Sequence, residues 1–136
     1  MKEEQKSMKN FIYLLVDYMN QLELAYPVKI GIFDNESSLM IKPVEGSQII
    51  HEYMNGMADI RLLFELSIKN KDQEVAYNVL SEVIEHFKDL QTFLNRNESR
   101  EYLLLNLEMD QIPVFQESKD GYFYYTTKIT VELTVT

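Results

Sequence analysis

The sequence predicts an α+β fold, a two-layer sandwich in which two amphipathic helices cover a mainly antiparallel sheet. The apolar periodicity of the 136-residue chain changes in the order helix, strands, helix, strands, which is typical of this class. Only two helical segments are present, too few for the crossovers of a doubly wound parallel sheet. Because glycine (4) and proline (3) are rare and no linker divides the chain, residues 1–136 are expected to form one domain.

The N-terminal part of the chain predicts a helix followed by a hairpin. Residues 4–24 carry apolar side chains three or four residues apart, and Pro27 disfavours helix in the residue before it. Residues 28–33 show the two-residue period of a strand, residues 34–38 are turn-forming, and residues 39–42 return as a second strand. We expect these two strands to pair as a hairpin.

A second hairpin is predicted over residues 48–69. Asn55-Gly56 favours a two-residue type I′ turn, because both residues tolerate positive φ angles. The register of such a turn sets Glu52 opposite Asp59, a like-charge pair that costs stability. In the second arm, alternate apolar side chains share one face: Ile60, Leu62, Phe64, Leu66 and Ile68.

The C-terminal half predicts a helix and two further strands. Asn70 is the expected N-cap, with Gln73 reaching back, of an amphipathic helix over residues 71–94. Residues 101–110 alternate as a strand, and glycine- and proline-containing residues predict a connection after it. Residues 123–135 alternate over more than a dozen positions, so one face should pack on the core and the other meet water or a partner.

Composition excludes several function classes. The absence of cysteine excludes disulfides, thiolate metal sites and a cysteine nucleophile. The net charge of −9 argues against tight binding to nucleic acid or anionic membranes. No apolar run approaches the ~18 residues of a membrane helix, and the charged N-terminus is unlike a signal peptide. We therefore expect an acidic intracellular protein.

The sequence offers weak signals for enzyme chemistry. The four glycines never cluster into a phosphate-binding loop. The two histidines each have acidic neighbours: His86 follows Glu82 by one helical turn, and His51 lies with Glu52 and Asp59 in the predicted hairpin. Both groups are better explained as solvated residues than as metal sites. We predict no catalytic residue, no metal and no cofactor.

Aromatic residues make up 12% of the chain and are more informative about function than the histidines. Tyr122, Phe123, Tyr124 and Tyr125 are consecutive, so two of them must face away from the core. Tyrosine in such places often contacts a partner, because it combines a large apolar area with a polar tip. An ordinary strand start with half-exposed rings explains the pattern equally well.

One set of motifs resembles a known family. Met40–Ser47 (Met-Ile-Lys-Pro-Val-Glu-Gly-Ser), Glu52–Gly56 (Glu-Tyr-Met-Asn-Gly) and Arg61–Glu65 (Arg-Leu-Leu-Phe-Glu) resemble the small minor capsid proteins of long-tailed phages of Gram-positive bacteria. These proteins are encoded among the head–tail joining genes. The resemblance continues through the helix near residues 75–93 and the closing strand, but only residues 40–65 are distinctive.

The resemblance implies a tail-terminator-like domain with a structural role in virion assembly. Such a protein forms a homo-oligomeric ring, a hexamer, which caps the tail tube and presents the surface to which the head docks. The implied partners are further copies of the chain, the tail tube protein and a head–tail connector protein. The implied location is the head–tail junction of the virion, assembled in the host bacterial cytoplasm. The resemblance brings no catalytic residues.

Two alternatives stay open. A head-completion or neck protein would occupy the same location. A small ligand-binding or metal-dependent enzyme domain is the alternative from another class, and it depends on the histidine groups.

Assembly and DNA passage suggest two sets of residues. We expect the Asn55-Gly56 hairpin to project and contact a neighbouring subunit or the tail tube, since apolar residues crowd its turn. The candidate interface comprises Ile49, Ile50, Tyr53, Met54, Met57, Tyr122 and Tyr124. A lumen lined with unpaired lysine and arginine would hold DNA, so a neutral or acidic lining is expected. The candidate lining comprises Thr126, Lys128, Thr130, Glu132 and Thr134, or alternatively Glu82, Glu85 and Asp89.

Overall fold

A single mixed sheet carries the fold. The computed structural model describes residues 2–96 and 102–135, with side chains from Phe11 onward. Its elements are α1 (Lys2–Gln21), β1 (Val28–Ile30), β2 (Ser38–Pro43), β3 (Gln48–Glu52), β4 (Ala58–Asn70), α2 (Gln73–Glu85), α3 (Phe87–Arg96), β5 (Tyr102–Met109), β6 (Val114–Lys119) and β7 (Tyr122–Val135). The strand order is β1-β2-β4-β7-β5, and in addition β3 pairs with β4 and β6 with β7. The predicted α+β class with a mainly antiparallel sheet is confirmed.

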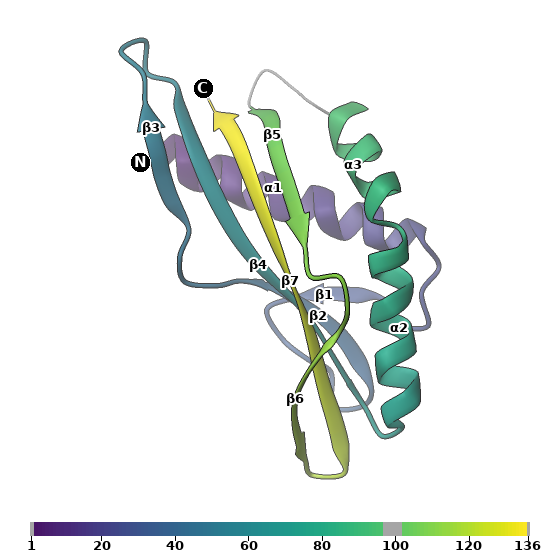
Figure 1. Ribbon diagram of the computed structural model, residues 1–136. Coiled ribbons are helices and arrows are strands. Elements are labelled where there is room, and N and C mark those ends of the chain that lie inside the picture. The colour runs from purple at the N-terminus through teal and green to yellow at the C-terminus, as the bar shows by residue number, and fades with distance from the viewer. Residues whose placement is uncertain (1, 97–101, 136) are drawn as a thin grey trace.

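The two long central strands, β4 and β7, organise the sheet. They pair antiparallel over their whole length, from Ala58 opposite Val135 to Asn70 opposite Phe123. The outer edge of β4 is shared by β2 and β3, and the outer edge of β7 by β5 and β6 (Figure 1). β4 and β7, with 13 and 14 residues, are longer than their neighbours, so each pairs with two short strands along its outer edge.

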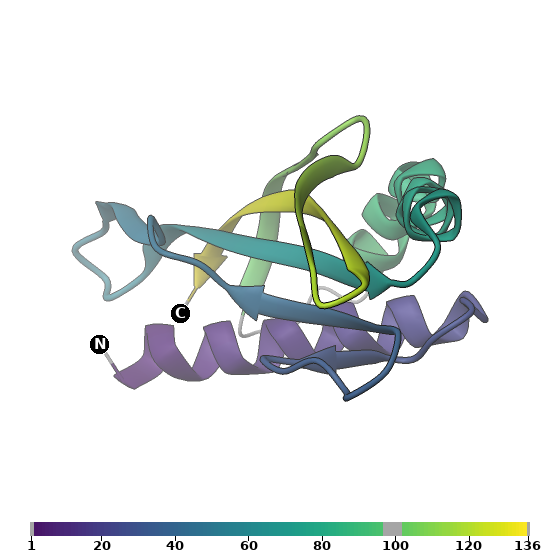
Figure 2. The same ribbon diagram turned by 90° about the horizontal axis from the view of Figure 1, so that it is seen from below.

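One face of the central strands forms the core with the helices. Side chains at alternate positions of β4, from Ile60 to Ile68, are buried as predicted, as are those of β7 from Tyr125 to Val135. All three helices contribute to this core cluster, and Phe11 of α1 stacks on Phe64 at 6.2 Å. Figure 2 shows α1 beneath the sheet and α2 and α3 along its side. None of the described helices is long and apolar enough to cross a membrane.

The predicted hairpin over residues 28–42 is wrong. β1 and β2 pair in parallel, with Val28 opposite Leu39 and Ile30 opposite Ile41. Gly31 adopts φ +79°, a left-handed conformation that ends β1, and its N–H donates to the Ile41 carbonyl at 2.8 Å. The turn-forming residues that follow must therefore lead the chain back to the start of β1 before β2 begins. Ile32, predicted inside the strand, is exposed.

The predicted hairpin over residues 48–69 is present, but its turn is one residue longer. The Tyr53 carbonyl accepts from the Gly56 N–H at 3.1 Å, and the Tyr53 N–H donates to the Met57 carbonyl at 2.8 Å. Gly56 has φ +88°, so three residues separate the closing pair, as in a type I turn followed by a glycine bulge.

This extra residue shifts the pairing register. Asp59 lies opposite His51, and Glu52 lies opposite Ala58. The predicted like-charge pair of Glu52 with Asp59 is therefore wrong, because that pairing assumed a two-residue turn.

The predicted helix over residues 71–94 is two helices, so the helical layer has three members in the described chain. The helix axis breaks at His86, whose N–H donates to the Val83 carbonyl at 3.1 Å. The N-cap is Asp72 and not Asn70: its Oδ1 accepts from the Glu74 and Val75 N–H groups, at 3.0 and 3.2 Å. Asn70 is instead the last residue of β4.

The region predicted as a simple connection contains a further strand, β6. It forms a hairpin with β7 through Asp120 and Gly121, whose φ angles of +54° and +82° fit a type I′ turn. The alternation predicted for residues 101–110 is also interrupted. A bulge between Leu104 and Asn106 changes which side chains of β5 face the core.

Candidate assembly surfaces

The β3–β4 hairpin ends in an exposed apolar tip. Figure 1 shows this hairpin extending beyond the ends of the neighbouring strands. Ile49, Ile50 and Tyr53 are each more than 40% exposed, and Met54 at the turn is fully exposed. Met57 is partly buried. The hairpin tip, defined here as these five residues, is thus a cluster of apolar surface at one end of the molecule.

The base of the hairpin is held by hydrogen bonds to one carboxylate. Asp59 accepts from the Tyr53 hydroxyl at 2.8 Å and from the Thr134 hydroxyl at 2.6 Å. The His51 ring packs edge-on against Tyr53, with ring centroids 4.5 Å apart. Side chains of β3, β4, β7 and the turn therefore meet at Asp59. Sequence reasoning missed this contact because the assumed register placed Asp59 beside Glu52.

These contacts change the acidity of both partners. The hydroxyl hydrogen bonds from Thr134 and Tyr53, with the nearby His51, lower the pKa of Asp59. The hydrogen bond to Asp59 raises the pKa of Tyr53, since it favours the protonated phenol. The contacts therefore favour a charged carboxylate and a neutral phenol at the base of the hairpin.

Neither histidine lies in a cluster of metal ligands. His51 lies opposite Asp59, but Glu52 lies at another position of the ladder. His86 Nδ1 is 3.1 Å from Asp89 Oδ2, an exposed pair three residues apart on the helix surface. Among the residues whose side chains are described, 11–96 and 102–135, no group of three or more His, Asp or Glu side chains could hold a metal ion.

Tyr122 and Tyr124 pack against their own chain. The Tyr124 ring lies edge-on to Phe33, with centroids 5.8 Å apart. The Tyr122 hydroxyl donates to the Asn35 carbonyl at 3.3 Å, and Lys69 Nζ lies 4.9 Å from the Tyr122 ring centroid. The residues after β1 thus cover both rings, which are partly buried. Because both rings keep part of their surface exposed, their place in the candidate interface stays a prediction.

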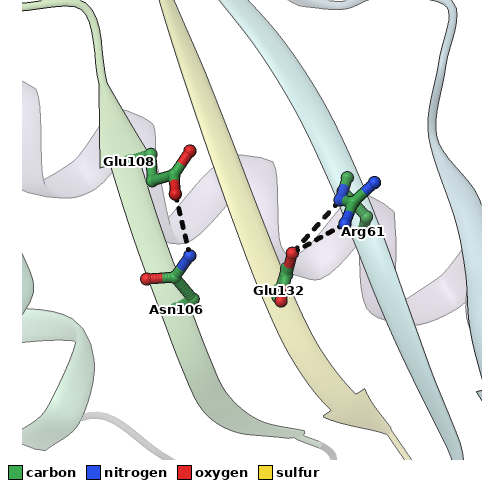
Figure 3. A network of polar contacts seen from close by, with 4 residues as sticks. All are labelled: Arg61, Asn106, Glu108 and Glu132. Atoms are coloured by element: carbon green, nitrogen blue, oxygen red, sulfur yellow. Dashed lines mark hydrogen bonds and ion pairs between the residues drawn. The ribbon is translucent and has the colours of Figure 1, made fainter.

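The sheet face opposite α1 carries the predicted lumen residues. We call this surface, which includes Arg61, Lys128, Thr130, Glu132 and Thr134, the open face. Figure 3 views it with α1 behind the strands. Lys128 is exposed, and the other four residues are partly exposed.

Thr126 does not belong to the exposed part of this face. Its side chain is 1% exposed, and its hydroxyl bonds to Glu65 Oε1 at 2.9 Å and to the Leu66 carbonyl at 3.1 Å. The prediction that Thr126 lines a passage is therefore wrong, because neighbouring side chains on its own sheet cover it.

The open face carries an ion pair between Arg61 and Glu132. Arg61 donates through Nε and Nη2 to Glu132 Oε1, at 3.2 and 3.0 Å, and Asn106 donates to Glu108 at 3.3 Å (Figure 3). Lys128 lies opposite Glu65 in the register of β4 and β7. The face thus presents both charge signs and no basic patch.

Two further surfaces bear on the alternatives. Glu82, Glu85 and Asp89, the second candidate lining, occupy exposed positions on α2 and α3, away from the core. A groove of about 550 Å³ lies where these helices meet β5, and its lining includes apolar and acidic residues: Ile84, Phe87, Leu107, Glu108, Met109, Asp110 and Gln111.

Comparison with known proteins gives no assignment. No protein-family model matches the chain, and no curated protein matches it in sequence.

Proposed function

We propose that the protein is a structural component of a phage head–tail junction: a tail terminator whose copies form a ring, a hexamer, on the end of the tail tube. The observation that carries this proposal is the projecting hairpin with its apolar tip. Exposed apolar surface of this kind, at one end of the molecule, favours contact with another protein.

The proposed mechanism is geometric. Each copy contacts the next through two different surfaces, which is a heterologous contact. Such contacts close into a ring when a whole number of copies completes one full turn. The closed ring caps the tube and prevents further subunits from adding. The hairpin tip is proposed to contact the neighbouring copy or the tail tube protein. The opposite end of the ring is proposed to contact the head–tail connector protein.

The open face is the proposed lining of the DNA passage. In a ring with one sheet layer and one helix layer, the bulkier helices fit better on the outside, where the circumference is larger. This arrangement turns Lys128, Thr130, Glu132 and Thr134 toward the axis. Because Glu132 is paired with Arg61 and Lys128 is the one other basic residue named on this face, such a lining would not hold DNA tightly.

Removal of the gene from a phage that carries it tests this role and separates it from the closest alternative. Without a terminator, tube polymerisation is uncapped, so electron micrographs of the lysate should show tails of uncontrolled length. Tails of normal length beside unattached heads would instead indicate a head-completion or neck protein. Intact, infectious particles would contradict both, and would leave the ligand-binding alternative, for which the groove beside β5 is the relevant site.

A further inference from the structure

The groove beside β5, called here the β5 groove, lies where the helical layer moves from one strand to another. α2 packs on β4 and β7, whereas α3 packs on β5. Ile84 and Phe87, on either side of the helix break, line the groove together with the end of β5. Its volume of about 550 Å³ lies within the range of about 300–1,000 Å³ that is usual for binding sites.

The apolar lining of the β5 groove continues into the core. Leu107 and Met109 lie opposite Val131 and Ile129 of β7, which are buried core residues, so all four side chains share the helix side of the sheet. Leu107 is itself buried, whereas Met109, Ile84 and Phe87 keep part of their surface exposed. Methionine adapts its shape to different neighbours. These residues therefore favour a partner that brings apolar side chains of its own.

The charged residues of the β5 groove are acidic. Glu108, which is exposed, and Asp110, which is partly exposed, line it, and none of the described lining residues is basic. The adjoining last turn of α2 adds Glu82 and Glu85 and contains no basic residue. Lys88, which follows Phe87 on α3, is exposed but is not among the lining residues. The charge of the groove therefore complements a positively charged partner.

Neutral donors hold both carboxylates in place without cancelling their charge. The Asn106 amide donates to Glu108 at 3.3 Å, and the Lys128 backbone N–H donates to Asp110 Oδ2 at 2.9 Å. A lysine or arginine of a partner would add the missing positive charge. The hairpin tip of a second copy complements the groove less well, because Glu52 and Asp59 at its base have the same charge sign as the groove.

We propose that the β5 groove binds a basic, amphipathic segment of another protein. The apolar side chains of this segment would pack on Ile84, Phe87 and Met109, and its lysine or arginine side chains would lie beside Glu108 and Asp110. Amphipathic segments dock into apolar grooves in this way in other recognition systems. The contact goes beyond the proposed function, because neither the ring nor the DNA passage uses the groove.

A synthetic amphipathic peptide of leucine and lysine is a suitable probe. We would add it to the full chain and follow backbone and methyl NMR signals, with the same peptide carrying glutamate in place of lysine as the comparison. The expected result is saturable binding of the lysine peptide, with the largest shifts at Ile84, Leu107 and Met109. The glutamate peptide should not bind, because its charge repels both groove carboxylates.

Two matched variants separate the groove from the net charge of the chain. Glu108→Gln should weaken binding of the lysine peptide by about two- to fivefold, the size expected of one solvent-exposed ion pair. Glu45→Gln removes the same charge from an exposed position after β2, on the other side of the sheet, and should change the affinity less. Both substitutions keep the shape of an exposed side chain, so neither should disturb the fold.

Four outcomes would overturn the proposal. Equal weakening in the two variants would show attraction by net charge alone, and equal binding of the two peptides would show adhesion to apolar surface alone. Shifts centred on the hairpin tip would place the peptide there. Failure of the lysine peptide to bind would show that the groove does not take such a segment. None of these outcomes bears on the ring, so the proposed function would stand or fall separately.

Discussion

At the scale of single residues, Asp59 determines how the hairpin is attached to the sheet. Its carboxylate joins a turn residue, Tyr53, to the C-terminal strand through Thr134. The charged carboxylate accepts both hydrogen bonds more strongly than the protonated acid does, so the contact depends on protonation. The contribution to stability should be present above the ordinary pKa of about 3.8 and be lost as the pH falls through the lower pKa of the folded protein.

We predict that Thr134→Val raises the pKa of Asp59 toward its ordinary value. The substitution removes the hydroxyl that contributes most to the lowered pKa while keeping a β-branched side chain of similar size. Carboxyl chemical shifts followed by NMR through an acid titration measure this directly. Thr130→Val, on the same strand and face, is the control and should leave the Asp59 pKa unchanged. An unchanged pKa in Thr134→Val would show that the 2.6 Å contact does not form in solution.

Single residues also show why the hairpin register was not predictable. Asn55-Gly56 correctly indicated the turn, since both residues tolerate positive φ angles. Only Gly56 adopts a positive φ angle. The bulge adds one residue to the turn, so Asp59 lies opposite His51 and not opposite Glu52. Turn length is decided by a single φ angle, whereas the sequence pattern is compatible with either length. The hydrogen bonds of Asp59 could therefore not be inferred beforehand.

At the scale of elements, periodicity predicted which strand faces are buried but not which strands pair. Period two is a local property, and it correctly identified the core sides of β4 and β7. Pairing depends on the path between strands. The residues between β1 and β2 looked like a hairpin turn, but the chain leaves β1 at Gly31 and returns for a parallel ladder.

The helical periodicity of the sequence also did not predict the break between α2 and α3 at His86. Residues 71–94 contain no glycine or proline, and their apolar stripe continues through both helices. The backbone nevertheless leaves the α-helical conformation at His86, with ψ of 12°, before α3 begins. The core side chains Leu90 and Leu94 remain buried after the break. Packing of this kind lies outside what a one-dimensional pattern describes.

Two leucine substitutions test the assignment of strand faces. Leu66 of β4 is completely buried, so Leu66→Ala should lower the free energy of unfolding by about 2–5 kcal/mol. Leu103→Ala on β5 removes the same atoms from a half-exposed position and should change it by no more than about 0.5 kcal/mol. Urea unfolding at a concentration where the protein is dissociated gives both values. Equal losses would contradict the exposure of the outer side of β5.

At the scale of the whole molecule, the sequence predicted the class and the outward-facing residues, but not what covers them. Alternation shows that a side chain points away from the core, yet it cannot distinguish solvent from another part of the chain. Thr126 is covered by its neighbours on β4, and Tyr122 is partly covered by the segment after β1. Ile49, Ile50, Tyr53 and Met54 of the hairpin tip are exposed among the described residues, because the hairpin extends beyond the neighbouring strands.

The whole-molecule charge makes a prediction about DNA. Six copies at −9 each, with Arg61 paired to Glu132 on the open face, should bind duplex DNA no more tightly than ordinary non-specific binding, with Kd weaker than about 10⁻⁴–10⁻⁶ M at physiological salt. Fluorescence anisotropy with a labelled duplex across a salt series measures this. Tight binding that weakens steeply with salt would rule out a non-adhesive passage.

The Arg61–Glu132 pair provides a matched variant for the same titration. Glu132→Gln frees Arg61 on every copy and should strengthen DNA binding relative to wild type. Glu85→Gln removes the same charge from an exposed position on α2, away from the open face, and should have a smaller effect. If the two variants bind DNA equally well, the open face is not the surface that DNA meets.

The central claim is that copies of this chain close into a ring, and native mass spectrometry across a concentration series tests it most directly. The account predicts one dominant oligomer of six copies that grows with concentration at the expense of monomer. The Ile50→Lys variant, which places a charge on the β3 edge, should shift this equilibrium toward monomer, whereas Tyr13→Lys on α1 should not. A wild-type chain that stays monomeric throughout, or one that forms an open-ended series of oligomers without a preferred size, would contradict the account.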